Sequence, residues 1–221
     1  MTASLQLSRV RTAVIRVEFG EFTTVGTHEK RGRGAVRRPF TATDRGLTRA
    51  SVRWGVRTGR LWAVERGVFV DGTEPPTPLE RAVGAVIATN GVASGRLAGI
   101  LLDLDSADRA RGPYVTVPKS GDGHRTGVSR RDLAAEHVIS VDGVRCTDGL
   151  HTLVDLAAQV DDLVWEQMLE SALRRKLTTI HEIEAELAVL SRSRTQESIA
   201  SDVFLRADRA ARRRQRACSR R

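Results

Sequence analysis

The chain reads GLTRASVRWGVRTGRLWAVERGVFV at residues 46–70, and within this segment a helical pattern gives way to a strand pattern. Thr48 has a hydroxyl that can accept from the open backbone N–H groups of a first helical turn. Gly59 supplies a residue of the kind that ends helices. The residues between them therefore predict a short helix that runs to about Thr58.

Basic residues gather on one side of this predicted helix. At 100° per residue, four arginines fall within a sector of about 80°: Arg49, Arg53, Arg57 and Arg60. Val52 and Val56 are four residues apart, so we expect them to anchor the neighbouring side of the helix in a small core. A solvated arginine face on an ordinary helix is the plainer alternative.

A hairpin is predicted directly after the helix. Leu61, Ala63 and Val68 lie in two short strand-like runs on either side of an Arg66-Gly67 dipeptide that suits a tight turn. A basic helix that leads into a hairpin is the layout of a winged helix-turn-helix, in which the helix enters the major groove. We therefore expect the following residues to bind DNA: Arg49, Ser51, Arg53, Trp54, Arg57, Arg60 and Arg66.

The same segment resembles a known family. Its threonine entry, its Leu-Thr-Arg helix start at residues 47–49, its Gly-Arg-Leu at residues 59–61 and its Arg-Gly-Val-Phe-Val at residues 66–70 are similar to the N-terminal winged helix of the actinobacterial AbiEi-like antitoxins. These proteins belong to type IV toxin–antitoxin (abortive infection) systems. The resemblance implies a DNA-binding antitoxin-like regulator in the bacterial cytoplasm, with a nucleotidyltransferase-like toxin as its partner.

A second signature extends the resemblance over residues 40–205. The family's Thr...Arg-Thr...Asp-Leu-Ala segment is matched by Thr147, Thr152 and residues 155–157, but His151 replaces the arginine. Gly95 stands where the family has a histidine, so no role of that histidine is expected here. Related proteins carry the same front half ahead of a very-short-patch-repair-like endonuclease domain.

Composition supports a nucleic-acid partner and indicates no membrane partner. The formal net charge is +9, and residues 206–221 alone carry eight arginines and one aspartate. Arginine binds phosphate bidentately, although an arginine-rich composition also fits a GC-rich genome. Cys146 and Cys218 are too few for a disulfide framework or a zinc site of their own, which favours a cytoplasmic location. No apolar run is long enough to span a bilayer, and we find no signal-peptide pattern.

Along the whole chain we expect an α+β fold in which a winged helix-turn-helix precedes a mixed helical domain with a small antiparallel sheet. Helices are predicted over 79–89, 92–104, 164–176 and from the Thr179–Glu182 capping-box pattern, and a further helix is predicted to be capped by Thr147. Asp142-Gly143 predicts a hairpin turn. The expected organisation is a flexible basic leader (1–39), the DNA-binding domain (40–72), an antitoxin-like α+β domain (79–190) and a basic tail (191–221).

Catalytic and metal chemistry is not expected. The glycine-rich residues 119–131 lack the Gly-Lys-Ser/Thr ending of a phosphate-binding loop, so a hairpin loop is the better interpretation. His151 and Asp155 share a helical face and could form a metal pair, but an ion pair or hydrogen bond is the more common use of such a pair. Beyond Thr195 no carboxylate cluster for phosphodiester cleavage is visible. We expect no enzyme, no cofactor and no metal.

Three functions remain open on the sequence. The first is an antitoxin-like transcriptional regulator that recognises its own promoter. The second is the DNA-recognition part of a truncated endonuclease. The third is an interaction module that does not bind DNA.

Overall fold

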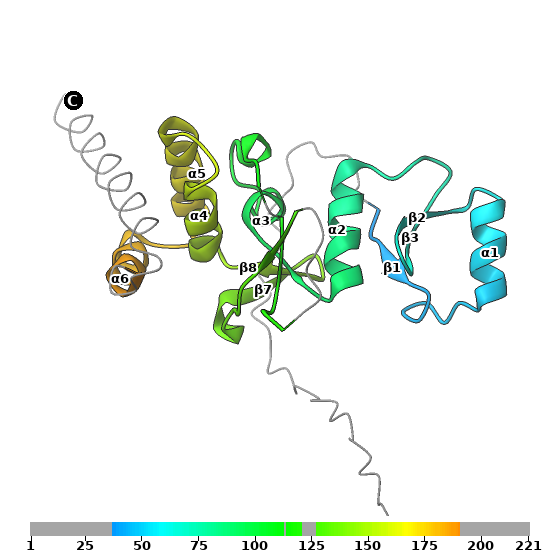
Figure 1. Ribbon diagram of the computed structural model, residues 1–221. Coiled ribbons are helices and arrows are strands. Elements are labelled where there is room, and N and C mark those ends of the chain that lie inside the picture. The colour runs from blue at the N-terminus through cyan, green and yellow to red at the C-terminus, as the bar shows by residue number, and fades with distance from the viewer. Residues whose placement is uncertain (1–36, 113, 121–126, 191–221) are drawn as a thin grey trace, which may run out of the picture.

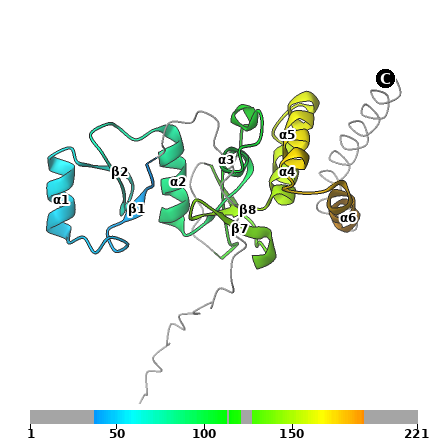
Figure 2. The same cartoon turned by 180° about the vertical axis from the view of Figure 1, so that it is seen from behind.

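The computed structural model describes residues 37–112, 114–120 and 127–190, and this part of the chain has a mixed α+β fold (Figure 1). It contains six α-helices and two sheets. Seen from both sides, the elements follow one another across the molecule from α1 at one end to α6 at the other (Figure 2). The expected basic tail and the expected leader up to residue 36 lie outside the described residues. None of the described helices is long and apolar enough to cross a membrane.

A three-stranded antiparallel sheet lies next to α1. Its strand order is β1-β3-β2, with β1 at Phe40–Thr41, β2 at Leu61–Glu65 and β3 at Val68–Asp71. The turn predicted at Arg66-Gly67 is confirmed, and Gly67 has a φ of +80°, which a glycine adopts without strain. The sheet thus carries a hairpin whose tip is Arg66-Gly67.

The predicted helix is confirmed as α1, Arg49–Arg57, with both of its ends as expected. The N–H of Ser51 donates to the hydroxyl of Thr48 at 3.1 Å. At the other end Gly59 has a φ of +69°, and the N–H of Arg60 donates to the carbonyl of Gly55 at 2.9 Å. This bond is part of a Schellman motif, which satisfies carbonyls that the helix end leaves open.

The predicted core contact of α1 is wrong. Gly55 is the only fully buried residue of the helix; Val52 is half-buried and Val56 is 44% exposed. The helix approaches the sheet so closely at Gly55 that an added Cβ would meet Cδ1 of Leu61 at 2.7 Å. The closest contact of the helix with the sheet is therefore made by a glycine and not, as expected, by Val56.

No helix precedes α1 in the described part of residues 40–72. The chain leaves β1 through turns at residues 42–46. Thr41 and Asp44 close these turns reciprocally, since the N–H of Thr41 donates to Oδ2 of Asp44 at 2.8 Å and the N–H of Asp44 donates to Oγ1 of Thr41 at 3.2 Å. The segment therefore contains a strand, one helix and a hairpin, without the first helix of a helix-turn-helix pair.

Helix α2, Pro78–Thr89, lies between the two sheets (Figure 1). A capping box starts it, in which Thr77 and Glu80 each accept from the other's backbone N–H. On one side Gly84 rests against Val64 of the three-stranded sheet, where an added Cβ would meet a methyl group at 2.7 Å. On the other side Val83 and Val86 belong to the larger core. One helix thus closes the small core and contributes to the large one.

The second sheet has five strands in the order β6-β5-β4-β8-β7. The strands are β4 (Val92–Ala93), β5 (Val115–Val117), β6 (Val128–Arg130), β7 (Val138–Val141) and β8 (Val144–Thr147). It is mixed, because β4 pairs with β8 and β5 with β6 in parallel. The antiparallel sheet expected from the sequence is therefore wrong, and part of the reason is that β4 is only two residues long and lies where a helix was predicted to begin.

Helices cover this sheet on the side away from α1. Asp148 caps α4 by accepting from the N–H of His151, so the predicted Thr147 cap is wrong by one residue. The predicted capping box of α6 is confirmed, with Thr179 and Glu182 bonded reciprocally. The remaining helices are α3 (Gly95–Leu101), α4 (Gly149–Ala157), α5 (Asp162–Arg174), α6 (Ile180–Leu190) and two short 3-10 helices, η1 (Ala107–Arg109) and η2 (Ala135–His137).

Arg37, just before β1, is bound to the segment that connects β3 to α2. Its side chain donates to both carboxylate oxygens of the buried Glu80, at 2.9 and 2.8 Å, and its backbone N–H donates to the same group at 3.0 Å. The guanidinium also donates to the carbonyls of Asp71, Glu74 and Pro75. Arg37 falls within the expected basic leader, yet its contacts are those of a structural clamp.

Candidate functional site

The arginine row of α1 points directly away from the sheet. Arg49, Arg53 and Arg57 are all exposed. Their positions on a helical wheel centre about 160° from Gly55, the residue by which the helix packs. The row therefore faces outward at one end of the molecule, where α1 lies (Figure 1).

The start of α1 is electrically suited to an anion. A helix N-terminus carries a partial positive charge, and an acidic residue in the first turn is the usual way to offset it. Here the first turn has no acidic residue, and Arg49 adds a positive charge instead. The N-terminus of α1 therefore has a strong positive potential, which a bound phosphate group would neutralise.

Trp54 adds an exposed aromatic ring beside the arginine row. It is 46% exposed, and the guanidinium of Arg60 lies 4.8 Å from the centroid of its ring. Arg60 follows the end of the helix, so it is not a fourth member of the row but folds over the tryptophan instead. Such a stack leaves the charge of Arg60 available to a ligand.

The last two expected DNA-binding residues have different environments. Ser51 is exposed, but its hydroxyl lies 2.8 Å from Oγ1 of Thr48 and so belongs to the helix cap. Arg66 is exposed at the tip of the β2–β3 hairpin, as its place in the turn predicted. The structure thus brings together Arg49, Arg53, Arg57, Trp54 and Arg60 on and beside α1, and it places Arg66 separately on the hairpin.

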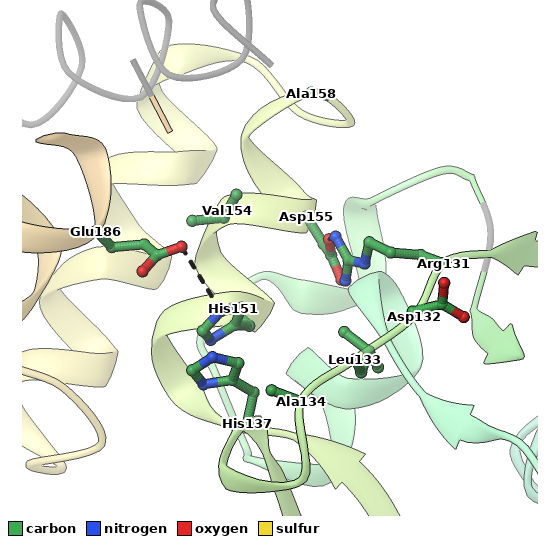
Figure 3. Close-up of a pocket in the computed structure, with 10 residues that line it drawn as sticks. All are labelled: Arg131, Asp132, Leu133, Ala134, His137, His151, Val154, Asp155, Ala158 and Glu186. Atoms are coloured by element: carbon green, nitrogen blue, oxygen red, sulfur yellow. Dashed lines mark hydrogen bonds and ion pairs between the residues drawn. The ribbon is translucent and has the colours of Figure 1, made fainter. Parts of the chain in front are cut away.

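A second site, which the sequence did not predict, is a pocket of about 260 Å³ between the η2 region, α4 and α6 (Figure 3). The rings of His137 and His151 are stacked on its wall, with their centroids 3.8 Å apart. Nδ1 of His151 lies 3.0 Å from Oδ1 of Asp148, and Nδ1 of His137 lies 3.5 Å from Oδ2 of the same carboxylate. The two imidazoles therefore turn the same ring nitrogen towards one aspartate.

Electrostatics tie Asp148 and His151 together. Burial raises the pKa of the Asp148 carboxyl, but hydrogen bonds from the side chain and backbone of His151 outweigh it and leave this pKa below its usual range. Burial lowers the pKa of His151, whereas Asp148 and then Glu186 raise it, with a net rise that Arg131 reduces. The pair favours a charged carboxylate next to a cationic ligand or a protonated ring.

The predicted pairing of His151 with Asp155 does not form. Asp155 accepts instead from both terminal nitrogens of Arg131, at 2.7 and 3.1 Å (Figure 3). A shared helical face shows which residues could meet, but it does not reveal a competing partner from another strand. Asp155 thus lines the same pocket as His151, but its carboxylate is paired with Arg131.

A signal for the histidine cluster was present in the sequence. The predicted Asp142-Gly143 turn fixes the register of β7 and β8, with Val138 opposite Thr147. The same register places His137 opposite Asp148, and the N–H of Asp148 donates to the carbonyl of His137 at 3.0 Å. His151 follows Asp148 by three residues on a helix, which returns it to the same side.

Comparison with known proteins gives no family to which the chain can be assigned. No protein-family model matches the sequence, and no curated protein matches it either.

Proposed function

We propose that the protein binds double-stranded DNA through α1 and the β2–β3 hairpin, and that it acts as an antitoxin-like transcriptional regulator of its own promoter. The observation that carries this proposal is the outward-facing row of Arg49, Arg53 and Arg57 on a helix that buries only a glycine. A helix of this kind contributes little to a core, so its exposed side chains are better explained by a ligand. Spacing of four residues along a helix lets arginines follow one groove of a duplex.

The order of elements supports a winged-helix mode of binding. A strand, a basic helix and a hairpin follow one another, and the hairpin carries an exposed arginine at its tip. In this mode α1 reads base edges in the major groove while Arg66 contacts the flanking phosphates. Gly55 against Leu61 and the caps at Thr48 and Gly59 hold α1 in place, where a complete helix-turn-helix would use its first helix.

The partner and the setting come from the family resemblance. An AbiEi-like regulator would act in the bacterial cytoplasm and would be paired with a nucleotidyltransferase-like toxin. The region from α2 to α6 would then support the DNA-binding end and contact that partner. We propose no catalytic activity, so supercoiled DNA should remain uncut when it is incubated with the purified protein and Mg²⁺.

Fluorescence anisotropy with two duplexes tests the proposal. One duplex carries the DNA upstream of the protein's own gene, and the other has the same composition in random order. Arg53→Ala should reduce the preference for the promoter duplex, since a base-reading arginine contributes about 1–3 kcal/mol of discrimination. Arg109→Ala, which removes an exposed arginine on η1, is the matched control and should leave the preference unchanged.

The basic tail separates specific from general binding. Deletion of residues 206–221 removes eight arginines, and we expect it to weaken binding to both duplexes equally and to flatten the salt dependence. If the tail deletion abolishes the promoter preference while Arg53→Ala leaves it intact, α1 is not the element that reads the sequence.

A second candidate function is protein binding at the same helix. It is favoured by the exposed apolar side chains Trp54 and Val56 that flank the arginine row. If the protein shows no salt-sensitive DNA binding, and Trp54→Ala disrupts a complex with the toxin encoded next to it, this function replaces the first. A truncated endonuclease that keeps only DNA recognition would instead be indicated by a nuclease reading frame directly downstream.

A further inference from the structure

The histidine cluster lies away from α1 and is not explained by DNA binding. It consists of His137 at the end of η2, Asp148 at the cap of α4 and His151 in the first turn of that helix. One atom from each residue, a ring nitrogen or a carboxylate oxygen, lies within 4.8 Å of the others. We propose that these three residues bind a divalent transition-metal ion of the zinc type, and this proposal goes beyond the proposed function.

The distances fit the bonds of such an ion. With bonds of about 2.0–2.1 Å, two ligands of a tetrahedral zinc ion lie about 3.3 Å apart. Oδ2 of Asp148 is 3.1 Å from Nδ1 of His151 and 3.5 Å from Nδ1 of His137. The two rings are stacked with 28° between their planes, so an ion between the three groups requires both imidazoles to turn until their Nδ1 lone pairs converge on it.

The two carboxylate oxygens of Asp148 have different contacts. Oδ1 accepts from the backbone N–H of His151 at 2.7 Å and so holds the start of α4. This bond fixes the carboxylate. Oδ1 also lies 3.0 Å from Nδ1 of His151, whereas Oδ2 lies near Nδ1 of both imidazoles. A ligand that is already positioned by the fold loses little freedom when it binds a metal.

The outer ring nitrogens face carboxylates, as they do in many histidine-bound metal sites. Nε2 of His151 lies 3.7 Å from Oε1 of Glu186 on α6, and Figure 3 shows this glutamate directed at the ring. Nε2 of His137 lies 3.8 Å from Oε1 of Glu136. These distances are longer than hydrogen bonds, so each carboxylate would have to close on Nε2 to hold a proton there while Nδ1 binds the metal.

The local charge and the choice of ligands define the ion. Arg131, the nearest cation in the pocket, is neutralised by Asp155, so Asp148 and Glu186 leave an excess of negative charge around the histidines. Two imidazoles and one carboxylate suit zinc or a similar transition metal, whereas Mg²⁺ and Ca²⁺ prefer oxygen alone. The adjoining pocket gives water access to the fourth position.

Calorimetric titration of the tag-free full chain with ZnCl₂, after EDTA treatment and dialysis, tests the proposal. The wild type should bind one equivalent, and MgCl₂ should give no binding. His137→Gln, His151→Gln and Asp148→Asn should each weaken zinc binding at least about tenfold, and Glu186→Gln should weaken it about tenfold because it removes an outer-sphere carboxylate. His181→Gln changes an exposed histidine on α6, and as the matched control it should bind zinc like the wild type.

Stability provides a second measurement. ZnCl₂ should raise the Tm of the wild type and of the His181 variant, EDTA should reverse the rise, and the Asp148→Asn variant should show none. Because asparagine can still cap α4, the Asp148→Asn variant should fold even if a histidine variant does not, and it then provides the test of zinc binding. Absence of stoichiometric zinc binding, or equal losses in the His181 and His151 variants, would overturn the proposal.

Discussion

The helices α1 and α5 are packed in opposite ways. Helix α5 buries six of its residues in the core of the five-stranded sheet, and among them Trp165 is completely buried. Helix α1 buries one glycine and leaves Trp54 half exposed on the far end of the molecule. The difference teaches that stability is concentrated around the larger sheet, while α1 keeps its place mainly through its caps and one close backbone contact.

The largest expected effect compares the two tryptophans. Trp165→Ala should lower the free energy of unfolding by about 3–5 kcal/mol, since it leaves a large cavity and removes a hydrogen bond from Nε1 to the carbonyl of Leu153. Trp54→Ala should change it by less than about 1 kcal/mol, because an exposed side chain leaves no cavity. Urea unfolding measures both, and equal losses would contradict the comparison.

The next effect concerns the clamp that joins the two regions. Burial raises the pKa of Glu80, but hydrogen bonds from Arg37 and from the backbone of Thr77 and Arg37 prevail and lower it from 4.5 to about 2. Glu80→Gln should therefore cost about 3 kcal/mol at pH 7. Thr73→Ala, an exposed position in the same link, serves as the control.

The sign of the pH dependence follows from this lowered pKa. Because the folded protein holds Glu80 ionised more strongly than the unfolded chain does, the stabilisation is complete above about pH 5 and is lost as the pH falls from 4.5 towards 2. Wild-type stability should therefore drop more steeply over this range than that of the Glu80→Gln variant. Parallel curves from urea unfolding at several pH values would show that the clamp does not carry this effect.

A smaller effect compares the caps of the two helices. Thr48→Ala and Asp161→Ala each remove a side chain that accepts from a backbone N–H, worth about 1 kcal/mol. In α5 the loss should appear as lower global stability. In α1 it should appear as faster hydrogen exchange of that helix alone, because few buried contacts join α1 to the rest. A global loss from Thr48→Ala as large as that from Asp161→Ala would show that α1 is part of the cooperative core.

The smallest effect is expected at the surface of the three-stranded sheet. The guanidinium of Arg45 lies over the ring of Phe40 and forms an ion pair with Asp71. Both charged side chains are about half exposed, so Arg45→Ala should cost no more than about 1 kcal/mol. Urea unfolding at low and at high salt measures this loss. If the loss is the same at both salt concentrations, the aromatic contact accounts for it rather than the ion pair.

Local signals in the sequence located most of the helices and the turns. The Thr48 cap, the Gly59 stop and the Asp142-Gly143 turn could all be predicted, because each depends on the chemistry of a few adjacent residues. The α+β class followed from these elements. The capping box at Thr179 could be predicted for the same reason.

Features that depend on distant partners were not predicted. Gly55 packs where Val52 and Val56 were expected, since its lack of a side chain lets the backbone approach Leu61. The parallel pairing of the two-residue strand β4 with β8 joins segments about fifty residues apart, and short strands carry little periodic signal. Arg37 became a clamp because the buried Glu80 needs a counter-charge, which composition alone could not assign.

The single glycine contact of α1 has a consequence for engineering. Because Gly55 is the only fully buried residue of that helix and positions 49, 50, 53, 54 and 57 are all exposed, these five positions can be varied together without disturbing the core. A library that randomises these five positions and retains Thr48, Gly55 and Gly59 would change the exposed surface while preserving the scaffold. Selection from such a library would show which ligands this exposed helix can be made to bind.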